Sequence, residues 1–250
     1  MIVDCHSHAS GGRSFGLSPA PVADFVAGMD RCGIDKALVY TTDGFFFDFV
    51  TCNDALHAFV QDFPDRLVAG PTVNPRYGKA AVAEMRRCRL ELGMKGPLKL
   101  HPWLQGFSPV EPYMDAIAEA AIELGMPIMF HDGTPPYCTP LQVAALAARF
   151  PELTVILGHS GLKDLWQEAL AAAKRYPNIL LCLCGTLPLG IEQIAAEIEP
   201  QRLLFGTDAG FGVAPGNREY RLGQIQRLAV PEEVKALILG GNAERIFDLA

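Results

Sequence analysis

The chain has 250 residues, half of them hydrophobic and 20% charged, which is enough apolar material for a sizeable core. Its formal net charge is -7, from 21 basic and 28 acidic residues, and this disfavours a nucleic-acid partner because phosphate binding needs a basic face. The seven cysteines form no CxxC pair, and there is neither a signal-peptide pattern nor a membrane-length apolar run, so we expect a cytoplasmic protein without a membrane partner.

Short apolar runs alternate with longer helical patterns along the whole chain. The apolar runs predict strands at residues 1–6, 34–40, 66–73, 97–101, 126–131, 153–159, 178–184 and 202–205. Helices are predicted after them at residues 19–32, 53–63, 79–92, 112–124, 139–150, 162–176, 190–198 and 219–228. Two more helices, at residues 232–239 and 242–249, finish the chain.

Eight strand-then-helix units in a chain of this length fit an α/β fold of the (β/α)8 TIM-barrel type. The predicted strands are almost continuously apolar, as in a parallel sheet that is buried on both faces. A doubly wound open sheet is the alternative, although no GxGxxG pattern follows the first strand. No linker divides the sequence, so we expect residues 1–250 to form one domain with its active site at the C-terminal ends of the strands.

The positions of the histidines are the most informative feature of the sequence. All but one of the six lie at the carboxyl end of a predicted strand, namely His6, His8, His101, His131 and His159. In a barrel, this is the rim on which the loops build the active site. The sixth, His57, lies on a predicted helix and is interpreted as a surface or packing residue.

Four side chains from three strand ends form a candidate metal-binding set. His6 and His8 are one residue apart, so on a strand they project to the same side. His131 opens a His-Asp-Gly sequence after the fifth predicted strand, and Asp208 closes the eighth in Gly-Thr-Asp. Imidazole nitrogens with a carboxylate oxygen suit a divalent cation such as zinc, with water completing the shell.

These residues lie in sequence patterns that resemble the amidohydrolase superfamily. The similar stretches are residues 3–8, 99–102, 127–131, 158–161, 206–208 and 238–247. The sequence is most similar to the amidohydrolase-related branch, which includes aminocarboxymuconate-semialdehyde decarboxylase and pyrone-dicarboxylate lactonase. The resemblance implies a TIM barrel in which His6, His8, His131 and Asp208 bind one divalent metal, expected to be zinc, with manganese or iron as alternatives.

The resemblance also implies the catalytic residues. Asp208 would accept the proton of the attacking water, and His159 would act as an acid or base or polarise the substrate. A bound metal lowers the pKa of its water from about 16 towards 7, which agrees with these roles.

Two residues of the fourth predicted strand have more than one interpretation. Relatives with two metals bridge them through a carbamylated lysine on strand four, where Lys99 lies, but the branch that this chain resembles is generally mononuclear. Lys99 and His101 are alternatively candidates for binding a substrate carboxylate, and a purely structural role for His101 stays open. On the predicted loops, Arg13 and Trp103 are candidate contacts of a carboxylate and a flat ring, or else pack against other loops or another subunit.

The leading functional hypothesis is a metal-dependent hydrolase that cleaves a lactone, amide or related acyl bond in a small molecule. The alternative is a non-oxidative decarboxylase of an aromatic or unsaturated carboxylic acid that uses the same metal site. A third reading, a barrel that binds a ligand without turnover, is disfavoured by the intact set of polar rim residues. The expected partner is a small-molecule substrate, and assembly into a homo-oligomer stays open.

Overall fold

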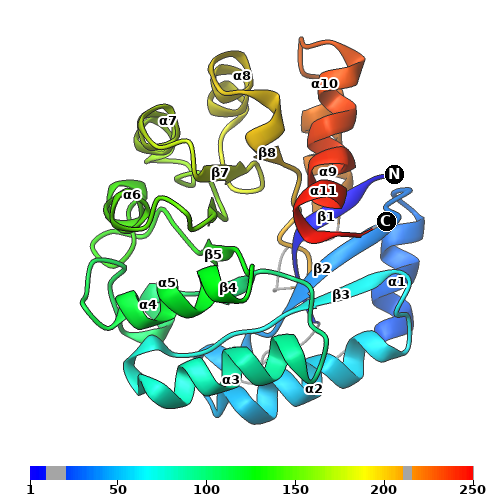
Figure 1. Cartoon of the computed structure of the whole chain (residues 1–250). Helices are drawn as coiled ribbons and strands as arrows, with labels where there is room; N and C mark the ends of the chain where they lie inside the picture. Colours follow the sequence, from blue (N-terminus) through cyan, green and yellow to red (C-terminus); the bar gives the residue numbers. More distant parts are fainter. Residues whose placement is uncertain (10–20, 211–215, 250) are drawn as a thin grey trace.

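The computed structural model describes residues 1–9, 21–210 and 216–249. Within these residues, eight strands lie at the centre and helices surround them (Figure 1). The strands are β1 (Val3–His8), β2 (Lys36–Tyr40), β3 (Leu67–Gly70), β4 (Leu98–Leu100), β5 (Ile128–Phe130), β6 (Val155–Leu157), β7 (Ile179–Cys182) and β8 (Leu203–Leu204). The predicted order of strands and the barrel architecture are both confirmed.

The strands pair in parallel and in sequence order, in the series β1–β2–β3 and the series β4 to β8. Backbone hydrogen bonds join the two series. Between β3 and β4, the Lys99 amide donates to the Pro71 carbonyl at 2.8 Å. Between β8 and β1, the Cys5 amide donates to the Phe205 carbonyl at 2.9 Å, and the His8 amide donates to the Ala209 carbonyl at 2.7 Å. These contacts close the barrel, with the first strand beside the last.

The helices of the outer layer follow the strands in turn. They are α1 (Val22–Asp30), α2 (Phe49–Gln61), α3 (Lys79–Leu90), α4 (Pro102–Gln105), α5 (Met114–Glu123), α6 (Pro140–Arg149), α7 (Trp166–Arg175), α8 (Pro188–Glu197), α9 (Asn217–Gln226), α10 (Glu232–Ala236) and α11 (Asn242–Phe247). The short helix α4 was not predicted. No helix among the described residues is both long and apolar enough to cross a bilayer.

Helix α2 begins at Phe49, four residues before the predicted start at Asn53. The cause is a side-chain cap, because the Asp48 carboxylate accepts the backbone N–H of Val50 at 3.2 Å and of Thr51 at 3.3 Å. Such a cap satisfies amides that have no partner within the helix.

Helix α7 begins at Trp166, later than the predicted start at Leu162. Three successive residues, Ser160, Gly161 and Leu162, have φ values of 49°, 84° and 54°. This left-handed backbone is incompatible with a right-handed helix and is costly for the two residues that are not glycine. The turn after β6 is therefore held in shape by its surroundings.

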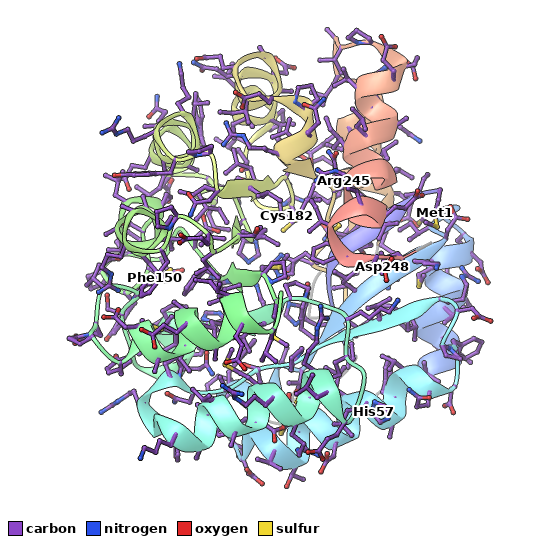
Figure 2. The ribbon with its side chains drawn as sticks, viewed as in Figure 1. Met1, His57, Phe150, Cys182, Arg245 and Asp248 are labelled. Atoms are coloured by element: carbon purple, nitrogen blue, oxygen red, sulfur yellow. The ribbon has the colours of Figure 1, made fainter. Side chains whose placement is uncertain are left out.

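Two apolar clusters support the barrel. The larger one lies between the strands and the helices, and the smaller one fills the barrel and contacts α11. Members of the smaller cluster are Val3, Cys5, Leu38, Tyr40, Met129, Ile156, Leu180, Cys182, Cys184, Leu204, Ala243, Phe247 and Leu249. Figure 2 places Cys182 near the centre, whereas His57 lies on α2 in the outer layer.

Candidate metal centre

Three predicted ligands meet where β8 joins β1. His6 and His8 are buried at the end of β1, and Asp208 follows β8 with its side chain 24% exposed. The Asp208 carboxylate oxygen Oδ1 lies 3.2 Å from His8 Nε2 and 3.6 Å from His6 Nε2. Asp208 adopts a left-handed φ of 59°, and its amide donates to the His6 carbonyl at 2.6 Å. This backbone bond fixes the carboxylate beside the two imidazoles.

The spacing of these three atoms fits a divalent cation. An ion bound tetrahedrally at about 2.1 Å from each ligand atom would separate those atoms by roughly 3.4 Å. The observed separations from Asp208, 3.2 and 3.6 Å, lie on either side of this value. The three ligand atoms all lie within 4.8 Å of one another. His6, His8 and Asp208 could therefore hold one metal ion.

The tautomer of His6 is suited to metal binding. His6 Nδ1 lies 2.8 Å from the Gly158 carbonyl, which can only accept, so Nδ1 carries the proton and donates it. Complete burial, and then the Lys99 charge, lower the pKa of His6 well below its ordinary value, which keeps the ring neutral. The lone pair is consequently on Nε2, the nitrogen nearest Asp208.

Lys99 brings a positive charge to the same atoms. Its side chain is 1% exposed, and its Nζ lies 2.9 Å from His6 Nε2. Burial would raise the pKa of Asp208, but the hydrogen bond with His8 and the electrostatic interactions with His6, His8 and Lys99 hold that pKa well below its ordinary value. The carboxylate therefore stays ionised.

His131, the fourth predicted ligand, lies a little apart from this group. Its ring stacks on His101 with 3.8 Å between ring centroids, and its Nε2 lies 3.1 Å from Thr134 Oγ1. Among the described residues, the group of converging ligand atoms at Asp208 contains His6 and His8 but not His131. Burial, and then the Lys99 charge, lower the pKa of His131 to about 3. Metal ligation by His131 stays a prediction.

His159 lies between the candidate ligands and the stacked pair. Its ring centroid is 4.6 Å from that of His6 and 4.4 Å from that of His131. Its Nδ1 lies 3.2 Å from Cys184 Sγ, and burial lowers its pKa well below the ordinary value. His159 is thus a neutral, buried imidazole at the centre of the cluster, beside a thiol whose placement the sequence did not reveal.

Asp4 is a buried carboxylate that sequence reasoning missed. It accepts the His6 amide at 3.1 Å, the Thr207 amide at 3.0 Å and the Thr207 hydroxyl. Asp4 thereby ties the strand that carries His6 to the loop that carries Asp208. The signal in the sequence is its place in Asp-x-His, two residues before the first histidine.

Asp132 forms the corresponding tie on the opposite side. It accepts the His159 amide at 2.7 Å and the Gly161 amide at 2.6 Å. The Thr186 hydroxyl also donates to the carbonyls of His159 and Ser160, at 3.0 and 3.1 Å. Together these bonds hold the left-handed turn after β6 and so fix His159.

Aromatic rings continue the cluster outward. The His101 ring lies 5.3 Å from that of Phe45 and 6.3 Å from that of Trp103, which is 52% exposed. The structure thus brings Trp103, a predicted substrate contact, near His101. The other predicted loop contact, Arg13, lies outside the described residues.

Arg221 is a further residue that the sequence did not single out. It donates to the Thr186 carbonyl at 3.4 Å and to Gln224 Oε1 at 3.0 Å, and its Nε is buried without a hydrogen-bond partner. Because Thr186 contacts the turn that bears His159, this guanidinium lies at the edge of the histidine cluster.

A protein-family model for amidohydrolases matches residues 3–249, nearly the whole chain. The chain belongs to the amidohydrolase family. The sequence-based assignment to this family is thereby confirmed. No match was found among curated proteins.

Solved structures with the same fold cover almost all of this amidohydrolase-family chain. A 5-carboxyvanillate decarboxylase from Novosphingobium aromaticivorans, complexed with manganese and 4-hydroxy-3-methoxy-5-nitrobenzoic acid, is 18% identical with a TM-score of 0.78, covering 99% of this chain and 96% of its own. A 2,6-dihydroxybenzoate decarboxylase from Rhizobium is 18% identical with a TM-score of 0.76, at 99% and 98% coverage. A 4-oxalomesaconate hydratase from Rhodopseudomonas palustris is 19% identical with a TM-score of 0.75, at 100% and 96% coverage.

Proposed function

We propose that this amidohydrolase-family protein is a metal-dependent, non-oxidative decarboxylase of an aromatic or unsaturated carboxylic acid. The observation that carries the proposal is a continuous row of rings that starts at the cation-fitting cluster. Neighbouring ring centroids lie 3.8 to 5.3 Å apart along the series His6, His159, His131, His101 and Phe45. A flat substrate can stack along such a row while its carboxylate reaches the charged end.

In this reaction the bond between the carboxylate and the adjacent carbon breaks and CO2 leaves. The electron pair stays on that carbon, which then takes up a proton that comes from solvent. A divalent metal held by His6, His8 and Asp208, with His131 as the proposed fourth ligand, would supply positive charge that binds and orients the substrate oxygens.

The residues around the proposed metal site have different roles in the reaction. Asp208 stays ionised, so it serves as a ligand or a base and not as the proton donor. His159 is the neutral imidazole placed between the ligands and the ring row, and we assign it the relay of the proton: one ring nitrogen takes up a proton from solvent as the other gives its proton to the carbon, so the ring is neutral again at the end of the step.

Two of the solved relatives named above are decarboxylases of aromatic acids, and this supports decarboxylation over the hydrolysis that the sequence alone favoured. At 18% identity these structures show that the fold is shared, so their reaction is a proposal for this chain. Manganese is named in one of these structures and supports manganese beside zinc as the metal to test.

Hydrolysis of a lactone, amide or related acyl bond is the second candidate. The observation that favours it is the ionised Asp208 carboxylate beside the ligand nitrogens, because such a carboxylate can accept the proton of an attacking water.

The decisive experiment compares both reactions on one preparation. The purified protein, supplied with Mn²⁺ or Zn²⁺, is incubated with hydroxylated benzoates and unsaturated dicarboxylates, and CO2 release is measured. The same preparation is then tested on lactones and amides. We expect metal-dependent CO2 release that a chelator abolishes. Turnover of lactones or amides without any CO2 release would assign the site to hydrolysis.

Arg221 is the proposed counter-charge for a substrate carboxylate, because its buried Nε has no protein hydrogen-bond partner. We expect Arg221→Gln to raise KM about tenfold with little change in kcat, since a charge-assisted hydrogen bond contributes about 1.5 kcal/mol. Steady-state kinetics would measure this, with Arg227→Gln at the exposed end of the same helix as the control. An unchanged KM would remove Arg221 from the substrate site.

A further inference from the structure

The position of Lys99 Nζ raises a question about the metal centre that the proposed reaction does not answer. It lies 2.9 Å from His6 Nε2, the nitrogen whose lone pair faces Asp208. A neutral imidazole has one such lone pair, which can accept a hydrogen bond from an ammonium or bind a cation, but not both. Lys99 and a metal ion therefore compete for the same atom.

We propose that Lys99 is an internal counter-ion that a metal ion displaces, so that its ammonium group stabilises Asp208 and His6 until the cation binds. This inference rests on the proposed metal site. A divalent ion at His6 Nε2 would lie close to the ammonium group, and two positive charges at that distance in a buried site repel strongly. Binding therefore requires the Lys99 side chain to move away.

The surroundings of Lys99 restrict this movement to the side chain. Its amide donates to the Pro71 carbonyl at 2.8 Å, and its carbonyl accepts the Thr72 hydroxyl at 2.7 Å, so the backbone is fixed on both sides. The four-carbon stem of a lysine can swing its ammonium group without moving the strand.

Gly158 packs closely on one side of the ammonium group. A Cβ atom there would clash with the Phe130 carbonyl oxygen and would lie 3.2 Å from His6 Cε1 and 3.3 Å from Lys99 Nζ, so the displaced ammonium group has to move away from this backbone. The face of the Tyr40 ring, whose centroid lies 5.8 Å from Nζ, can stabilise the displaced ammonium group through a cation–π interaction.

Three possible roles of Lys99 predict different effects of its removal on metal affinity. If the ammonium group competes with the metal, its removal strengthens metal binding and destabilises the protein without metal. If Lys99 is instead a ligand, as a carbamate, its removal weakens metal binding. If Lys99 only fills space, its removal leaves metal affinity unchanged.

The test uses Lys99→Met, which keeps the length of the side chain without its charge. Wild-type protein and variant are stripped with a chelator, and the dissociation constants of Mn²⁺ and of Zn²⁺ are measured separately by calorimetry, with thermal unfolding recorded before and after metal addition. Lys99→Gln is a second variant, and Lys174→Met, at an exposed lysine that pairs with Glu197, is the matched control.

We expect Lys99→Met to bind both metals at least about tenfold more tightly than wild type, because a nearby repelling charge is gone. Its metal-free midpoint of unfolding should fall by about 5 °C or more and recover when metal is added. If neither Lys99 variant folds without metal, refolding on addition of Mn²⁺ supports the proposal, and failure to refold overturns it.

Weaker or unchanged metal binding in Lys99→Met would also overturn the proposal. This failure is distinct from failure of the proposed function: wild-type protein that binds neither Mn²⁺ nor Zn²⁺ would remove the metal site itself, whereas wild-type binding without the increase in the variant would remove only the role of Lys99.

Discussion

Replacing Asp208 with asparagine is expected to lower kcat by about 10³-fold while the fold stays intact. The amide has no negative charge, so it is a poor metal ligand and cannot accept a proton at neutral pH. Asparagine tolerates the left-handed φ of 59° at this position, as aspartate does, which makes it the least disruptive replacement.

The measurement combines steady-state kinetics, metal affinity and circular dichroism of the Asp208→Asn protein. Asp62→Asn, at an exposed aspartate after α2, is the control and should match wild type in all three. Near-normal turnover of Asp208→Asn would exclude Asp208 from the mechanism.

Replacing Asp4 with alanine is expected to reduce the free energy of unfolding by about 3 to 5 kcal/mol, the largest stability effect of a single change predicted for this site. Alanine would leave the His6 amide and the Thr207 hydroxyl buried without their acceptor, whereas the Thr207 amide would keep its 3.2 Å bond to the His6 carbonyl. Each orphaned donor costs about 1 to 3 kcal/mol, and such costs are not strictly additive. Urea unfolding followed by fluorescence measures the change.

Asparagine at the same position is the matched comparison. Its one carbonyl oxygen can accept both amides that now share Asp4 Oδ1, and its NH2 can donate to the Thr207 hydroxyl after that hydroxyl rotates. Burial raises the pKa of Asp4 to about 6, so a neutral amide also avoids the cost of a buried charge. We expect Asp4→Asn to lose less than about 1 kcal/mol. Equal loss in both variants would contradict the role of Asp4 as an acceptor.

The sequence predicted the side chains at the strand ends better than the buried carboxylates that hold them in position. His6, His8 and Asp208 could be placed because strand parity and barrel topology decide where strand-end side chains point. Asp4 and Asp132 could not, because their partners are backbone amides of loops whose conformations depend on tertiary contacts. The direction of Lys99 was equally hidden, since parity turns it inward but does not say which atom it meets.

Local signals also failed where the chain leaves regular structure. The helical pattern from Leu162 was overridden by a left-handed turn that Asp132 holds from the loop after β5. The early start of α2 was, in contrast, a local signal, because Asp48 is a good N-cap by residue type. Caps can thus be predicted from neighbouring residues, whereas strained turns depend on residues far away in the sequence.

The junction between β8 and β1 has a consequence for the order of folding. His8 and Asp208 are 200 residues apart in the sequence, and Asp4 and Thr207 are 203 apart. Contacts of such high sequence separation carry a large loop-closure entropy and form after local pairings. During synthesis, β1 can therefore pair with β8 only after β8 has been made, and the ligands come together only then. Metal binding would thus report that the barrel is complete.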